Sequence, residues 1–156
     1  MVDIGGKEDV PRRAMARGEL KLKRSTVNAI KTKKIKKGDV VSTAKVAGIQ
    51  AVKDTSRVLP LCHQVPLTLV EIELEPRGDR VSCTCEVATE YKTGVEMEAL
   101  VGVAAALLTV WDMVKYLEKD DLGQYPNTRI ERIAVLEKRK GERGKEGGKT
   151  WKTRRI

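Results

Sequence analysis

Residues 68–87 read TLVEIELEPRGDRVSCTCEV, and this stretch decides which folds the rest of the chain can adopt. Its first part alternates apolar residues with glutamates, which is the period of a strand with one buried face. A Pro-Arg-Gly-Asp turn follows at 76–79, and apolar residues alternate again from Val81 to Val87. The stretch therefore predicts an antiparallel hairpin.

Helical patterns flank this hairpin on both sides. A short helix is predicted over Thr26–Lys33, and a stronger one follows Asp39 and extends to Ser56. A long helix is predicted over Val95–Leu117, and a last strand over residues 130–136. This order predicts an α+β fold, a ferredoxin-like sandwich in which helices pack on one face of an antiparallel sheet.

The chain has 156 residues and a formal net charge of +9, and this charge is unevenly distributed. Residues 138–156 hold nine Lys or Arg and two Glu, a balance of +7, which leaves +2 for residues 1–137. We therefore predict a single domain over 1–137 and a basic, disordered tail over 138–156. Residues 1–24 show no clear period and are expected to form a mobile arm.

The three cysteines and the absence of a signal-peptide pattern predict a cytoplasmic protein. The longest uncharged apolar run, Ala99–Trp111, is shorter than the roughly 20 residues that span a bilayer. Three cysteines and one histidine nominally match a zinc ligand set. Adjacent Cys62 and His63 cannot easily bind one tetrahedral ion, however, so no metal site is predicted.

The long helix carries the residues of greatest chemical interest. Around the helix axis, Glu98 and Lys115 each lie within about 60° of Asp112. The three residues therefore share one stripe of an otherwise apolar helix. Glu98 and Asp112 are about 21 Å apart along the axis, so they cannot serve one reacting atom within one chain. Either they hold opposite ends of a long substrate, or two subunits complete one site. The alternative is that Asp112 and Lys115 form an ordinary surface ion pair.

His63 lies in a stiff turn between two prolines, which favours a ligand-binding loop, although a lone histidine is as often structural. The sequence Lys37-Gly38-Asp39 precedes a helix, and a lysine at a helix N-terminus suits an anion. The chain has no phosphate-binding glycine loop or dinucleotide fingerprint. Substrate phosphates would therefore meet scattered cations, including Arg12 and Lys37.

Several segments, in order and at compatible spacing, resemble the MoaC family, the cyclic pyranopterin monophosphate synthases of molybdenum cofactor biosynthesis. The resemblance covers most of residues 1–138. The segments that carry it are KGDV at 37–40, AGI at 47–49, LPLCH at 59–63, TGVEMEAL at 93–100 and WDMVK at 111–115.

This resemblance implies a ferredoxin-like fold assembled as a hexamer, a trimer of dimers. It implies a phosphorus–oxygen lyase that converts the cyclised GTP intermediate, 3′,8-cyclo-7,8-dihydro-GTP, to cyclic pyranopterin monophosphate with release of pyrophosphate. No cofactor is implied, and whether Mg²⁺ accompanies the pyrophosphate is left open.

The resemblance also assigns residues by motif. It implies that Asp112, Lys115 and Lys37 are catalytic, and that the substrate is bound by Leu61, Cys62, His63, Met97, Glu98, Arg12 and Lys53. Such chemistry suits a carboxylate and a lysine of lowered pKa in a shielded pocket, because several proton transfers are required.

Two other classes of function are considered. The basic tail could make the chain a nucleic-acid-binding module, but the charge lies outside the predicted domain and aromatic residues for base stacking are few, at 3% of the chain. The chain could also be an oligomer with a scaffolding role alone. Loss of turnover on Asp112→Asn would separate an enzyme from a scaffold.

Overall fold

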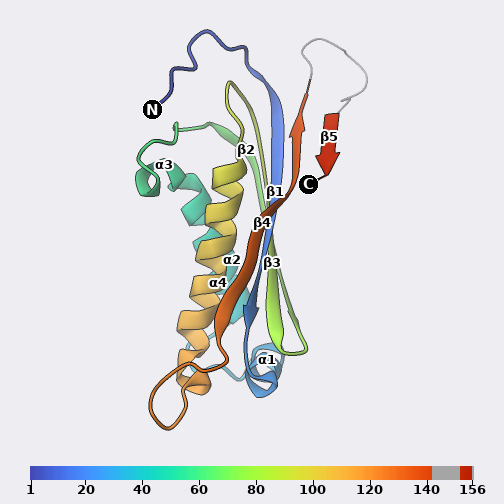
Figure 1. Ribbon diagram of the computed structural model, residues 1–156. Helices are drawn as coiled ribbons and strands as arrows, with labels where there is room; N and C mark the ends of the chain where they lie inside the picture. The colour runs from blue at the N-terminus through green and yellow to red at the C-terminus, as the bar shows by residue number, and fades with distance from the viewer. Residues whose placement is uncertain (142–151, 156) are drawn as a thin grey trace.

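A computed structural model describes residues 1–141 and 152–155 of the chain. It has two layers, a twisted antiparallel sheet and a layer of helices on one of its faces (Figure 1). The elements in chain order are β1 (Val10–Lys21), α1 (Arg24–Lys31), α2 (Val40–Lys53), α3 (Thr55–Val58), β2 (Leu67–Arg77), β3 (Arg80–Tyr91), α4 (Glu96–Glu118), β4 (Arg129–Lys140) and β5 (Lys152–Arg155).

The strand order is β2-β3-β1-β4-β5, and every neighbouring pair is antiparallel. The first four strands with the intervening helices form a ferredoxin-like arrangement, in which β1 and β3 are central. The predicted α+β class and the hairpin are confirmed. β3 pairs with β2 on one side and with β1 on the other, so the stretch quoted first supplies half of the four-stranded sheet.

β1 corrects the expectation of an N-terminal arm, because residues 10–21 form a central strand. Its inward positions include Ala14, Ala16 and Gly18, which carry little hydrophobic signal and have low strand propensity. Gly18 has no side chain because α4 lies close above it. A Cβ atom on Gly18 would lie 2.8 Å from Val103 Cγ1.

Two element boundaries also differ from those predicted. The helix expected to extend to Ser56 ends at Lys53, and a separate short helix, α3, follows it. β4 continues through the expected domain boundary at residue 137 and ends at Lys140. Most of the tail predicted to be disordered, residues 142–151 and 156, lies outside the described residues; 152–155 form β5 at the sheet edge.

The core is aliphatic and lies between α4, α2 and the inner face of the sheet. α2 and α4 approach each other closely at Gly48, where a Cβ atom would lie 3.1 Å from the Gly102 carbonyl oxygen. α4 is long and apolar enough to span a membrane by length and composition, yet half of its most apolar stretch is buried inside the molecule. It is the central helix of the core.

A buried carboxylate fixes the C-terminal end of α4. Glu118 is 1% exposed, and its two oxygens accept the backbone N–H of Lys23, at 3.2 Å each. Thr128 Oγ1 donates to Glu118 Oε2 at 2.5 Å. The Lys23 ammonium in turn donates to the carbonyls of Leu117 and Lys119. Glu118 thus joins the end of α4 to the start of α1 and to the approach to β4.

We expect Glu118→Ala to lower the free energy of unfolding by about 3 kcal/mol, because two donors lose their acceptor and each unsatisfied buried donor costs ~1–3 kcal/mol. Urea denaturation would measure this change. Glu75→Ala, an exposed residue on β2, is the control and should change stability by less than about 0.5 kcal/mol. Equal midpoints for the two variants would contradict the prediction.

Candidate functional site

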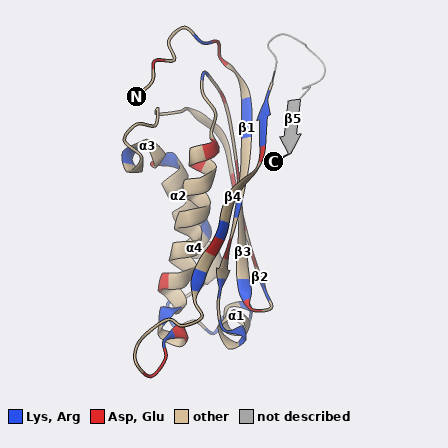
Figure 2. Cartoon of the chain, viewed as in Figure 1, with Lys and Arg blue, Asp and Glu red and all other residues tan. Residues whose placement is uncertain are grey.

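The charged residues of α4 are confined to its two ends, and its middle is apolar (Figure 2). Glu96 and Glu98 lie in the first turn, and Asp112 and Lys115 lie towards the C-terminal end. The structure therefore places the predicted site residues other than Arg12 in two groups, one at each end of the helix. Glu98 and Asp112, about 21 Å apart along an ideal helix axis, are not brought together within one chain.

The first group is a cluster of Asp112, Lys115 and Lys37, here called the Asp112 cluster. Lys115 Nζ lies 2.7 Å from Asp112 Oδ1, and Lys37 Nζ lies 2.8 Å from Asp112 Oδ2. Lys37 also donates to the Asp112 backbone carbonyl at 2.9 Å. Lys37 comes from the connector between α1 and α2, so the fold adds to the Asp112–Lys115 pair a residue that the sequence could group with it only by motif.

The two lysines hold the pKa of Asp112 down to about 2, with the hydrogen bond from Lys115 the largest cause and that from Lys37 the next. Asp112 in turn raises the pKa of Lys115. The expectation of a lysine with a lowered pKa is therefore wrong for Lys115 in the single chain, because its carboxylate partner stabilises the charged form. The expected shielding is also absent, since the Asp112 side chain is 56% exposed.

Two tyrosines that were not predicted from the sequence, Tyr116 and Tyr125, stand beside the Asp112 cluster. Tyr116 Oη accepts a hydrogen bond from the Lys36 backbone N–H at 3.1 Å. Tyr125 comes from the loop after α4 and makes an edge contact with Trp111, with ring centroids 5.8 Å apart. Tyr116 could have been predicted, because it lies one helical turn after Asp112 and so on the same face of the helix. Nothing local in the sequence linked Tyr125 to the cluster.

The second group surrounds a cavity of about 480 Å³ near the N-terminal end of α4. The turn that was predicted to bind ligand contributes Leu61, Cys62 and His63, and α4 contributes Met97 and Glu98. These five predicted substrate-binding residues therefore line one cavity. Residues of the N-terminal segment, Val2, Ile4 and Lys7, also line it and were not predicted.

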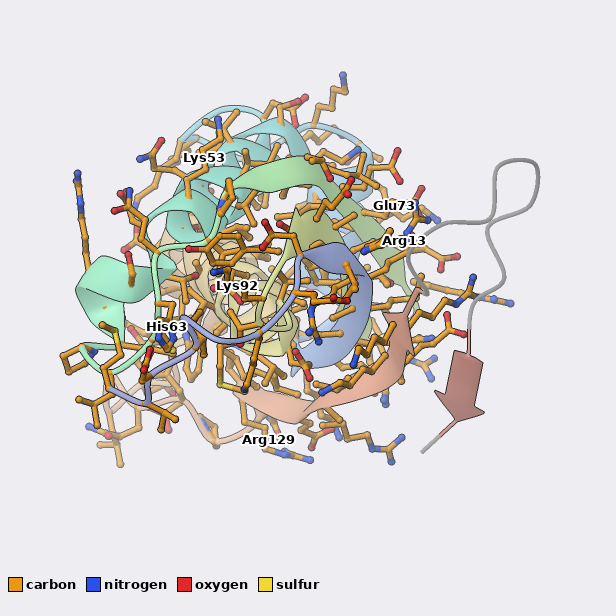
Figure 3. All side chains as sticks on the ribbon, turned by 90° about the horizontal axis from the view of Figure 1, so that it is seen from above. Arg13, Lys53, His63, Glu73, Lys92 and Arg129 are labelled. Atoms are coloured by element: carbon orange, nitrogen blue, oxygen red, sulfur yellow. The ribbon has the colours of Figure 1, made fainter. Side chains whose placement is uncertain are left out.

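A smaller cavity of about 220 Å³ lies beside the first and shares His63 and Glu98 with it. Lys53, at the end of α2, lines this second cavity. Figure 3 shows Lys53 and His63 on the helical side of the molecule, whereas Arg13 and Glu73 project from the open face of the sheet. The two cavities together give the second group a cation, an imidazole and a carboxylate.

Glu98 is the unusual side chain of this group, because it is 5% exposed and charged groups are seldom buried without a partner. Burial raises its pKa, the opposite direction from Asp112. Burial and the nearby charge of Glu98 also raise the pKa of the Cys62 thiol. Cys62 is therefore not an activated nucleophile.

Arg12 is used differently from the expectation of a cavity-lining cation. Its Nε and Nη2 donate to the carbonyls of Tyr91 and Lys92, at 2.9 and 3.1 Å. The Lys92 ammonium then donates to the Gly5 carbonyl at 2.9 Å, which ties down the N-terminal segment. In the single chain, Arg12 braces the strand end that holds the wall of the cavity.

Within residues 1–141, no group of three or more His, Cys, Asp or Glu side chains is arranged to hold a metal ion. Cys83 and Cys85 are buried in the sheet, where burial raises the pKa of each thiol to about 12. These two cysteines belong to the core.

A ligand-sized cavity at one end of the core helix of a ferredoxin-like domain, with a Lys–Asp–Lys cluster at the other end, is an arrangement suited to an enzyme that acts on a small molecule. The family model described as MoaC family matches residues 1–141, and the chain belongs to that family.

Curated relatives agree over most of the chain. The probable cyclic pyranopterin monophosphate synthase of Thermococcus kodakarensis is 57% identical over 142 residues, 91% of each chain. That of Aeropyrum pernix is 57% identical over 141 residues, 90% of this chain and 97% of the relative. A protein of Methanothermobacter thermautotrophicus named probable cyclic pyranopterin monophosphate synthase accessory protein is 52% identical over 142 residues, 91% of this chain and 89% of the relative.

The stabilising effect of the Asp112 cluster should depend on pH. Because the folded-state pKa is lowered from 3.8 to about 2, the contribution is complete above 3.8 and is lost as the pH falls through about 2. Lys115→Met and Lys37→Met should each raise the pKa of Asp112, the first by more. Carboxyl carbon-13 shifts would measure this titration. Lys45→Met, an exposed residue on α2, is the control, and an unchanged titration in both cluster variants would contradict the prediction.

Proposed function

We propose that the chain catalyses the formation of cyclic pyranopterin monophosphate from 3′,8-cyclo-7,8-dihydro-GTP, with release of pyrophosphate, in molybdenum cofactor biosynthesis. Family membership and relatives above 50% identity, two of them named as probable synthases, support this reaction. The observation that carries the proposal is that the ammonium groups of Lys37 and Lys115 each lie within 2.8 Å of a carboxylate oxygen of Asp112. Lys37 and Asp112 meet in this way although they are 75 residues apart in the sequence. No relative cited above is named for nucleic-acid binding.

The Asp112 cluster is proposed to carry the catalytic residues. Two ammonium groups on one carboxylate leave a net positive centre, and such a centre attracts phosphate oxygens. Once a substrate phosphate draws one lysine from Asp112, that lysine and the freed carboxylate can donate and accept protons. Mg²⁺ on the departing pyrophosphate is compatible with this role and is not required by it.

The cavity at the other end of α4 is proposed to hold the ring system of the substrate. The edge of a guanine-derived ring presents two adjacent N–H donors, and the Glu98 carboxylate on the cavity wall is a buried acceptor that could receive them. His63 and Lys53 lie on the walls of the same space. A ring bound there would satisfy a carboxylate that is otherwise costly to bury.

A second copy of the chain is proposed to complete the site. The helical layer leaves large apolar side chains exposed, among them Val46 at 68%, Met97 at 42% and Leu108 at 56%. An exposed apolar face of this kind favours association. If two α4 helices pack antiparallel, Glu98 of one copy approaches the partner's Asp112, and the axial separation within one chain is resolved. The proposed assembly is a hexamer of three such dimers, working in the cytoplasm.

Incubation of the full chain with 3′,8-cyclo-7,8-dihydro-GTP tests the reaction directly. We expect equal amounts of pyrophosphate and cyclic pyranopterin monophosphate, followed by a coupled phosphate assay and by mass spectrometry. GTP itself is the matched control and should release no pyrophosphate. Failure to turn over the cyclised substrate, by protein that binds it, would overturn the proposal.

Asp112→Asn should lower kcat by roughly 10²- to 10⁴-fold, the range for loss of a group that transfers protons. The amide keeps the size of the side chain, so the thermal midpoint and the oligomeric mass should change little. Steady-state kinetics and light scattering would measure both. Asp79→Asn, in the hairpin turn, is the control and should keep wild-type turnover.

Mixed oligomers test whether two copies share a site. Asp112→Asn and Glu98→Gln should each be inactive alone. When they are co-expressed at random, half of the dimers are hybrids with one intact site, so about a quarter of wild-type activity should return. Activity that stays at the level of the single variants would show that each site lies within one chain.

A further inference from the structure

We propose that Tyr116 is a positioning residue, which holds the main chain before Lys37 and so directs the Lys37 ammonium to Asp112. This inference rests on the proposed function of the Asp112 cluster. Its structural basis is the hydrogen bond from the Lys36 backbone N–H to Tyr116 Oη, at 3.1 Å. Tyr116 lies one helical turn after Asp112. This stretch of α4 therefore contacts the connector twice, through Tyr116 at the Lys36 backbone and through Asp112 at the Lys37 ammonium.

The connector between α1 and α2, residues 32–39, is otherwise held at its two ends, where N–H groups of residues 32–34 donate to carbonyls of α1 and Asp39 caps α2. Only Ile35 among these residues is buried. Lys33 and Gly38 have φ angles of 56° and 103°, and the Gly38 N–H donates to the Ile35 carbonyl, so the chain makes a tight exposed turn. Lys36 and Lys37 lie within this turn, away from the core.

In the part of the chain that the structure describes, few contacts tie Lys36 and Lys37 to α4. They are the two hydrogen bonds from Lys37 to Asp112, the hydrogen bond to Tyr116, and the Lys36 ammonium 5.9 Å from the centroid of the Tyr116 ring. Among these, only the hydrogen bond to Tyr116 holds the backbone of the connector itself. The contacts from Lys37 come from a long flexible side chain, which can be placed accurately only when its own backbone is placed.

A misplacement of about 1 Å in a reacting group can cost ~10²-fold in rate, so a single exposed hydrogen bond at this point has kinetic consequences. The Tyr116 ring is itself 38% exposed and is not part of the core cluster. Removal of the hydroxyl alone therefore tests positioning without opening a cavity.

Tyr116→Phe in the full chain should lower kcat by about tenfold with little change in KM. The matched control is Lys36→Met, which keeps the backbone N–H and loses only the ammonium over the ring, and it should keep turnover close to wild type. The same Tyr116→Phe change should cause no further loss in a Lys37→Met background, because the residue it positions is then absent. Equal loss in both backgrounds would overturn the inference.

The titration of Asp112 gives a measurement without substrate. The groups that face Asp112 are Lys115 on α4 and Lys37 on the connector, and Tyr125 faces Lys115 from the loop after α4. Once Lys37 is released, Asp112 loses one cationic partner, so Tyr116→Phe should raise its pKa, which carboxyl carbon-13 shifts would report.

The two measurements separate the inference from the function on which it rests. A raised Asp112 pKa with unchanged turnover supports the positioning role and overturns the proposed catalytic role of the Asp112 cluster. An unchanged Asp112 pKa overturns the positioning role, whatever turnover does.

Discussion

The burial of α4 against the sheet is the interaction on which the rest of the structure depends. Its apolar middle, with Ala99, Val103, Ala106, Leu107 and Val110 almost inaccessible to solvent, supplies the core contacts to β1 and β3. An unpaired charge on the buried side of such a helix would be desolvated at high cost, and the charged residues of α4 lie towards its two ends.

Each end of α4 is then fixed by a different kind of contact. At the C-terminal end, Glu118 holds the backbone of Lys23 and the side chain of Thr128, which places α1 and its connector beside Asp112. At the N-terminal end, Arg12 and Lys92 hold the chain segments that surround the cavity. Strands far apart in sequence therefore determine the surroundings of both groups of side chains.

The electrostatics of the two ends differ for a physical reason. Asp112 is exposed and has two cationic partners, so its pKa is lowered, whereas Glu98 is buried without such partners, so its pKa is raised. Two acidic groups whose pKa values are shifted in opposite directions lie 14 positions apart on one helix. Such a pair is suited to a reaction with several proton transfers. A substrate that contacts both must span about 21 Å in one subunit or lie between two.

The sequence by itself determined the hairpin, the long helix, the α+β class and the motifs that place the chain in its family, because periodicity and local spacing are properties of neighbouring residues. It did not indicate β1, whose inward Ala14, Ala16 and Gly18 carry little hydrophobic signal, and at Gly18 the close approach of α4 leaves no room for a side chain. It also grouped Lys37 with Asp112 by resemblance alone. Only the tertiary structure decided that these side chains meet, that Arg12 braces backbone rather than lining the cavity, and that Tyr116 and Tyr125 stand beside the cluster, because such contacts join segments whose separation in sequence carries no periodic signal.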